Sequence, residues 1–250
     1  MSQPLPGQSA PHDTVDQRVY QPWFERTRRH KGAKPYVSSA RSLNSDVGCK
    51  LTAIARFWRW FAENASRYRR LDVPEKEDLL NELQAALQAY NADLWFEVGG
   101  APEGPRELVI SAEGKRSAFG AVRALVAAAP LIPGWKAVAF KPRQGFEFVT
   151  SYEDITVAPD AAWFMPVESK NEWEGIDICV AYSHFEEKRR RQFEAATYVM
   201  LEAGLGEIAA AELINVIEVR AAPENPEIAG YLLLEALPRY LAENGYEIGI

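Results

Sequence analysis

The residues best suited to bind a ligand lie in one short stretch near the middle of the chain. Lys136, Lys141 and Arg143 are positively charged, and Trp135 and Phe140 stand among them. Cations beside aromatic rings can hold an acidic partner, a phosphate group or a single-stranded nucleic acid. The alternative is that these charges only flank a core strand, and both interpretations stay open. Trp135, Lys136, Lys141 and Arg143 are thus candidate ligand- or partner-binding residues.

Several carboxylates fall on predicted strands or in loops. Pairs of acids can hydrolyse bonds or hold Mg²⁺. On a half-exposed strand, however, outward acids usually form only polar surface. A carboxylate- or metal-dependent hydrolase is therefore the alternative function and not the leading one. The acids concerned are Glu97, Glu107, Glu113, Glu172, Glu174 and Asp177.

The chain carries no established catalytic motif. It has no dinucleotide-binding glycine pattern, phosphate-binding loop, zinc-protease motif, serine-hydrolase elbow or paired CxxC. Ser183 and His184 are adjacent, and adjacent side chains seldom face each other as nucleophile and base. The sequence therefore predicts no catalytic residue, no cofactor and no metal site. Whether the protein is an enzyme stays open, and a non-catalytic role is favoured.

Trp60 is a further candidate because helical geometry turns it away from the core. Trp58 and Phe61 belong to the inward stripe of a predicted helix. A residue two positions from Trp58 lies about 160–200° around the helix axis. Trp60 is therefore exposed or packed against another element, which points to an interface.

The elements that must position these residues begin with a pair of helices over residues 52–91. Ile54, Phe57 and Phe61 recur at the spacing of one helical face. The run Asp-Val-Pro-Glu at 72–75 is typical of the start of the second helix, with a capping residue, an early proline and an acid in the first turn.

After residue 92 the apolar period becomes two, which is typical of strands. The first half, residues 93–141, reads as two strands, a helix and a third strand. The same ββαβ order returns over residues 161–220. Two further edge strands are predicted between the halves, at 146–150 and 155–158.

These patterns predict an α+β fold with a largely antiparallel sheet or sheets. We predict that the two ββαβ halves are an internal duplication, with their helices packed on the sheet. A C-terminal helix is predicted over residues 225–243, with Pro238 kinking or ending it. Residues 51–250 are predicted to form one domain.

Residues 1–50 differ from the rest and are predicted to be a disordered or poorly ordered extension. They carry eight Lys and Arg against four Asp and Glu, and they lack apolar periodicity. One interpretation is a basic arm that touches a partner. The other is a tail without a role, outside a protein that begins near Leu51.

The whole chain carries a net charge of −7, which disfavours nucleic acid as the main ligand. No apolar stretch reaches the length of a membrane span. The two cysteines form no framework, so a reducing cytoplasm is expected. A protein partner stays open, and the sequence does not give the oligomeric state.

Three runs carry a resemblance: FWRWF at 57–61, ELVISAEG at 107–114 and PGWKAVAFKPR at 133–143. In these runs the chain resembles a family of uncharacterised bacterial cytosolic proteins, over about residues 51–220. The resemblance implies a bacterial origin and supplies no catalytic residue.

The leading interpretation is a non-catalytic binding or regulatory protein. The alternative is the carboxylate- or metal-dependent hydrolase, and an RNA-binding regulator that uses the stretch from Lys136 to Arg143 comes third.

Overall fold

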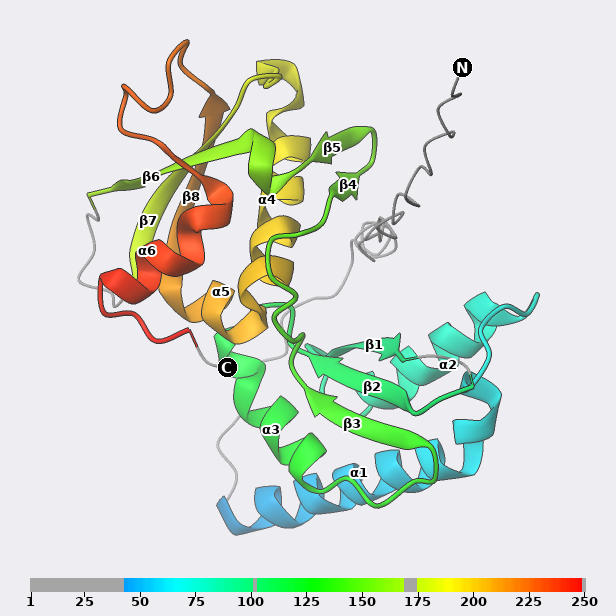
Figure 1. Ribbon diagram of the computed structural model, residues 1–250. Coiled ribbons are helices and arrows are strands. Elements are labelled where there is room, and N and C mark those ends of the chain that lie inside the picture. Colours follow the sequence, from blue (N-terminus) through cyan, green and yellow to red (C-terminus); the bar gives the residue numbers. More distant parts are fainter. Residues whose placement is uncertain (1–42, 101–102, 169–174, 249–250) are drawn as a thin grey trace, which may run out of the picture.

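The computed structural model describes residues 43–100, 103–168 and 175–248, with side chains from residue 51 onward. These residues form an α+β protein in two halves (Figure 1). One half holds helices α1 to α3 and strands β1 to β3, and the other holds β4 to β9 and α4 to α6. In the described part of the chain, no helix is both long and apolar enough to span a membrane.

The predicted helical pair is confirmed. It consists of α1 (Leu43–Asn64), a 3-10 turn η3 (Ala65–Tyr68) and α2 (Lys76–Gln88). The Tyr68 hydroxyl donates a hydrogen bond of 3.1 Å to the carbonyl of Leu79, which ties η3 to α2.

The predicted N-terminal extension needs a correction at its end. Residues 43–50 belong to α1, which begins at Leu43. The remainder of that extension, residues 1–42, lies outside the described residues.

The first half is built around a three-stranded sheet of order β1-β2-β3. The core lies on one face of this sheet, where all three helices cover alternate strand residues. The Trp58 indole N–H donates to the carbonyl of Leu125 at 2.8 Å and so joins α1 to α3. The elements are β1 (Trp95–Gly99), β2 (Arg106–Ser111), α3 (Phe119–Ala127) and β3 (Trp135–Ala139).

The second half contains a four-stranded sheet of order β8-β7-β6-β9, with α4 packed on one face. Its elements are β6 (Ala162–Val167), β7 (Ile176–Tyr182), α4 (Arg190–Leu205), α5 (Glu207–Leu213), β8 (Ile214–Ala221) and β9 (Leu232–Leu233). The predicted extra strands do not join this sheet. The second of them corresponds to β5 (Ile155–Val157), but residues 146–149 of the first are not a strand, and β4 begins only at its last residue (Thr150–Tyr152). β4 and β5 form a separate hairpin that packs against α4.

The prediction of largely antiparallel sheets is wrong, because both larger sheets are mixed. β1 pairs antiparallel with β2, and β2 pairs parallel with β3. β6 and β7 are likewise antiparallel, and β7 and β8 are parallel. The reason is that the helix after β2, like the helices after β7, returns the chain to the end of the sheet at which the preceding strand began. The next strand therefore runs parallel to it. The two halves share this order of pairings, while the duplication itself stays a prediction.

The predicted C-terminal helix over 225–243 is also corrected. Helix α6 spans only Leu237–Glu243, and Pro238 lies in its first turn, where a proline is favoured. Before it, β9 pairs with β6 and a 3-10 turn η7 (Leu234–Ala236) leads into α6. Pro238 therefore starts the helix and does not interrupt it.

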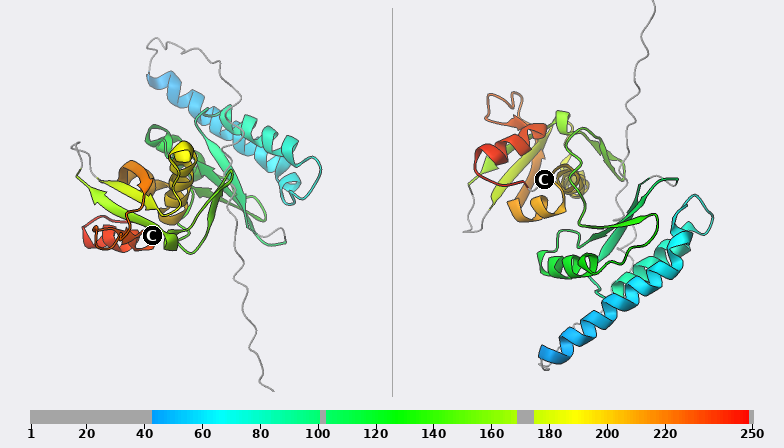
Figure 2. Two further views of the ribbon diagram at one scale, coloured as in Figure 1. Left: turned by 90° about the horizontal axis from the view of Figure 1, so that it is seen from above. Right: turned by 60° about the horizontal axis from the view of Figure 1, so that its bottom comes forward.

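Each half has its own buried apolar cluster. Helix α5 lies between them, as the right-hand view of Figure 2 also shows. Its Ala209 and Ala210 belong to the second cluster, while Ile208 and Ala211 pack against the first. This short helix thus joins the two halves at the place where β2 and β3 end.

Candidate functional site

The parallel strands β2 and β3 end side by side, and the residues that follow them meet α4 and α5. Sites in α/β sheets commonly form beyond the carboxyl ends of parallel strands. Here Glu113 follows β2, and Lys141 follows β3. Both reach residues from the second half of the chain.

Lys141 is buried, with 9% of its surface exposed, and its ammonium group gathers carboxylates from both halves. Its Nζ lies 2.7 Å from Oε1 of Glu113 and 2.8 Å from Oε2 of Glu202. Oε1 of Glu97, on β1, lies 3.8 Å away. Buried charges need such partners, because an unpaired ion in the interior costs several kcal/mol.

Glu207, the first residue of α5, is fully buried and forms hydrogen bonds with the backbone of the first half. Its carboxylate accepts hydrogen bonds from the N–H groups of Ala112, Lys141 and Gly114, at 2.7, 3.1 and 3.3 Å. Its own N–H donates to the carbonyl of Lys141 at 3.0 Å. Glu207 thereby fastens the ends of β2 and β3 to the second half. We call Glu97, Glu113, Lys141, Glu202 and Glu207 the Lys141 junction.

Burial dominates the electrostatics of Glu202. It raises the pKa of this carboxyl to about 7, against the opposing attraction of Lys141, while the charges of Glu113 and Glu207 add to the increase. Oε1 of Glu202 is buried without a hydrogen-bond partner among the described residues. Burial also raises the pKa of the neighbouring Tyr198 hydroxyl, and Glu202 and Glu113 raise it further.

The backbone beside the junction is strained. Glu113 and Phe140 have positive φ angles of 50° and 66°, which residues with side chains rarely adopt. Packing holds Phe140 in place: its N–H donates to the carbonyl of Ile110 at 2.8 Å, and its ring meets Phe119 edge-on at 4.9 Å. Such strain is often kept where geometry matters for function.

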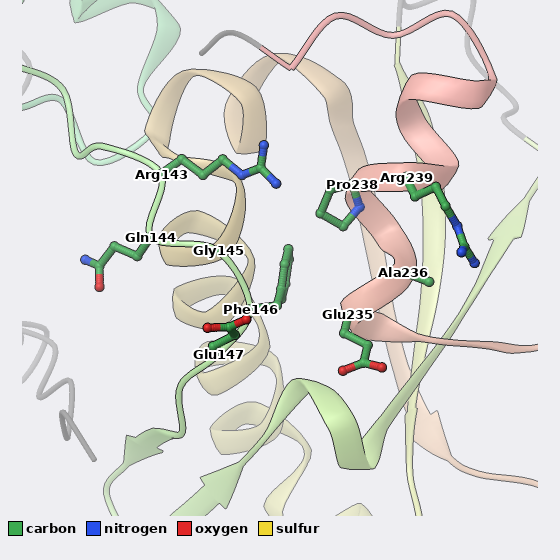
Figure 3. Close-up of a pocket in the computed structure, with 9 residues that line it drawn as sticks. All are labelled: Arg143, Gln144, Gly145, Phe146, Glu147, Glu235, Ala236, Pro238 and Arg239. Atoms are coloured by element: carbon green, nitrogen blue, oxygen red, sulfur yellow. The ribbon is translucent and has the colours of Figure 1, made fainter. Parts of the chain in front are cut away.

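After Lys141 the chain runs along α4 as a linker, residues 142–149. The N–H of Gln144 donates to the carbonyl of Ala203 at 2.8 Å. The ring of Phe146 lies so close to Gly204 that a side chain at that position would overlap it. Figure 3 shows this linker facing α6 across an open space, with Phe146 pointing toward α4.

Between the linker and α6 lies an open groove made of two adjoining hollows of about 740 and 820 Å³. Arg143, Pro238 and Arg239 line both hollows. We call this space the linker–α6 groove. Its remaining lining residues are Gln144, Gly145, Phe146, Glu147, Glu235, Ala236, Ala242, Gly245, Tyr246, Glu247 and Ile248. No residue of the Lys141 junction lines it.

The charged side chains of the groove are largely uncompensated. Within the described ranges, the side chains of Arg143, Glu147 and Glu235 make no ion pair and no hydrogen bond. Arg239 has one ion pair, to Glu243 at 3.9 Å, and its side chain is 75% exposed. Figure 3 shows Arg143 at one end of the first hollow and Glu147 and Glu235 at the other. The groove therefore offers separated positive and negative groups around apolar side chains.

The structure does not gather the predicted binding residues into one surface. Lys141 lies in the junction and Arg143 in the groove. Trp135 packs edge-on against Phe61, with ring centres 5.1 Å apart, and its indole N–H has no described hydrogen-bond partner. Lys136 is exposed on the opposite face of β3, 3.2 Å from Glu107. This separation follows from the alternation of side chains along a strand.

Trp60 packs against another element, as one of the two expected placements requires. Its ring lies 6.2 Å from that of Tyr68, and the residue is half-buried beside the first core. It lies on α1, far along the chain from the groove and the junction.

Of the six carboxylates considered, Glu97 and Glu113 reach the junction and Glu107 pairs with Lys136. Asp177 is buried on β7 in the second half, and Glu172 and Glu174 lie outside the described residues. Across the described ranges, no group of three or more His, Cys, Asp and Glu could hold a metal ion.

Sequence reasoning missed Glu202, Glu207 and most of the groove. One signal pointed to Glu202, since it is the only charged residue in the apolar run 199–205. An acid on the buried face of a helix needs a buried partner, and Lys141 supplies it. The groove had no local signal, because its two walls are about 90 residues apart in sequence.

Comparisons of the chain with protein-family models, with curated proteins and with solved structures give no match. Its function is therefore inferred from the geometry of the junction and the groove.

Proposed function

We propose that this protein is a non-catalytic binding protein whose linker–α6 groove holds a peptide segment of a partner protein. The observation that supports this most is Arg143, an exposed guanidinium in the groove without an ion pair among the described residues. Arginine recognises carboxylates through paired hydrogen bonds, so an acidic residue of the segment would meet it.

The shape of the groove favours an extended segment over a small molecule. Its two hollows are open to the surface and share Arg143 on the linker and Pro238 and Arg239 on α6. Sites for small molecules usually enclose most of the ligand. Phe146, Pro238, Tyr246 and Ile248 are partly buried and offer apolar contacts between the charged ends. The segment would pair an acid with Arg143 and a base with Glu147 and Glu235.

The chemistry of the groove supports binding without catalysis. Its lining has no Ser, Thr, Cys, His or Lys, so its candidate nucleophiles or bases are the carboxylates Glu147, Glu235 and Glu247 and the hydroxyl of Tyr246. The residues of the Lys141 junction do not line it, and three of them, Lys141, Glu202 and Glu207, are buried. A hydrolase acting through Glu147 and Glu235 would instead release product from a bound peptide.

The test is a positional-scanning octapeptide library on the full-length protein. We expect selected peptides to carry an acidic and a basic residue separated by apolar ones. Arg143→Gln should weaken the best peptide by about ten- to a hundredfold, because a charge-assisted hydrogen bond contributes about 1.5–3 kcal/mol. Arg59→Gln is the matched control, since Arg59 is exposed on α1 away from the groove.

Three other outcomes would change the proposal. Equal binding by Arg143→Gln and the control would remove the groove as the site. Cleavage of selected peptides would favour the hydrolase. Binding of single-stranded RNA that weakens steeply with salt would favour the RNA-binding alternative. We also propose the internal duplication and the membership of the bacterial family, and the outcome of this test depends on neither.

A further inference from the structure

We propose that the Lys141 junction is a pH-sensitive contact that sets the position of the groove's linker wall, so that deprotonation of Glu202 loosens the wall and weakens ligand binding. The effect of the linker wall on ligand binding rests on the proposed function. The effect of Glu202 on the position of the linker wall does not.

The junction holds more carboxylates than cations around one buried ammonium. Glu202, on α4, faces Lys141 after β3, Glu113 after β2, Glu207 on α5 and Tyr198 on its own helix. Glu97 on β1 reaches the same ammonium. With Glu202 ionised, one lysine must balance up to four carboxylates in a confined space. Protonation of Glu202 removes one of these negative charges.

Glu202 is the member of the junction suited to change its charge near neutral pH. Burial raises its pKa from the ordinary 4.5 to about 7. The folded protein therefore holds the Glu202 proton more tightly than the unfolded chain does. The resulting stabilisation is complete below about pH 4.5 and is lost as the pH rises through about 7.

The linker wall is attached to the turn of α4 that carries Glu202. Gln144 donates its N–H to the carbonyl of Ala203, the residue after Glu202. Phe146 packs on Gly204, two residues after Glu202. Arg143 follows Lys141 by two residues, and Lys141 binds Glu202 directly at 2.8 Å. A shift of this turn therefore moves both Arg143 and Phe146, which line the groove.

When the junction opens locally, the carboxyl group of Glu202 is hydrated by water and no longer surrounded by buried protein groups. At a pH above 7 the ionised carboxylate favours that open state, because its Oε1 has no described hydrogen-bond partner when buried. Below that pH the proton keeps the closed state. The linker should be protected from solvent at pH 5.5 and less protected at pH 8.

The test is hydrogen exchange of the peptide covering residues 143–148, corrected for the intrinsic effect of pH, without any ligand. In the wild type we expect protection to fall on the order of tenfold between pH 5.5 and 8. Glu202→Gln should keep its protection at both values. Glu212→Gln, the same change at an exposed position of α5, should behave like the wild type. An equal fall in wild type and Glu202→Gln would overturn the proposal.

A second measurement needs no variant. Titration of the wild-type protein, labelled with ¹³C at the glutamate carboxyls, should show one carboxyl with a midpoint near 7. If every glutamate titrates below about pH 5, the junction is not the switch. Both measurements are made without peptide, so failure of the proposed binding function leaves their outcome unaffected.

Discussion

A buried ammonium group is tolerated when carboxylates surround it, and Lys141 has them at 2.7, 2.8 and 3.8 Å. Removing the cation leaves the buried carboxylate of Glu202 without its counter-ion and close to the partly exposed Glu113. Removing one partner of a buried ion pair lowers the free energy of unfolding by more than the intact pair adds to it, because the other charge stays buried without a partner. Single residues of the junction are therefore where the fold is most sensitive to substitution.

Lys141→Met keeps an unbranched side chain that is one atom shorter and removes its charge. We expect it to lower the free energy of unfolding by about 3–5 kcal/mol. Urea denaturation at pH 8 measures the effect. Lys136→Met is the control, because its side chain is 69% exposed and its pair with Glu107 lies at the surface. That variant should stay within about 0.5 kcal/mol of the wild type. Equal effects of the two substitutions would contradict a buried junction.

The residue types alone pointed to Lys141 and Arg143, but not to their different roles. Both follow the same strand and both are basic, so sequence reasoning placed them on one surface. The turn at Phe140, with its positive φ of 66°, sends Lys141 inward, and Arg143 lies beyond it on the linker. A left-handed aromatic residue has no signature in the sequence, so this division could not be predicted.

At the scale of elements, the linker packs so closely against α4 that Phe146 fits only because residue 204 is a glycine. Gly204 lies within a helix, where glycine usually costs stability. The ring of Phe146 occupies the space that a side chain would need. The close packing of Phe146 therefore explains why a glycine occurs at this position of α4.

Gly204→Ala should push Phe146 away from α4. The overlap costs about 1–3 kcal/mol, which outweighs the helix-propensity gain of up to about 1 kcal/mol. Thermal unfolding should show a lower midpoint. Gly120→Ala in α3 is the matched control, since nothing lies within 4 Å of the added carbon, and it should be neutral or stabilising. In a Phe146→Ala background, Gly204→Ala should lose its penalty; a persistent penalty would mean that Phe146 is not the cause.

Periodicity predicted the helices and strands of both ββαβ units, because their apolar residues face a single core. It did not predict strand direction, which follows from how helices connect strands. It also missed α5, whose short sequence 207–213 has apolar residues on two sides because it touches both cores. A helix that serves two cores lacks the one-sided stripe that reveals a helix in sequence.

At the scale of the whole molecule, the two halves meet through charged and polar groups as well as through α5. Glu207 binds three backbone N–H groups of the first half, and Arg116 donates to the carbonyl of Ala211 on α5. Polar contacts of this kind need defined geometry. The junction therefore fixes how the linker leaves the first half and where the groove lies.

Affinity as a function of pH tests the central claim most directly, namely that the junction controls a peptide-binding groove. The best octapeptide from the library is titrated into wild type, Glu202→Gln and Glu212→Gln at pH 5.5 and 8. The wild type and Glu212→Gln should bind several-fold more weakly at pH 8, while Glu202→Gln should bind equally at both. Identical pH dependence in all three proteins, or no peptide binding in any of them, would contradict the account.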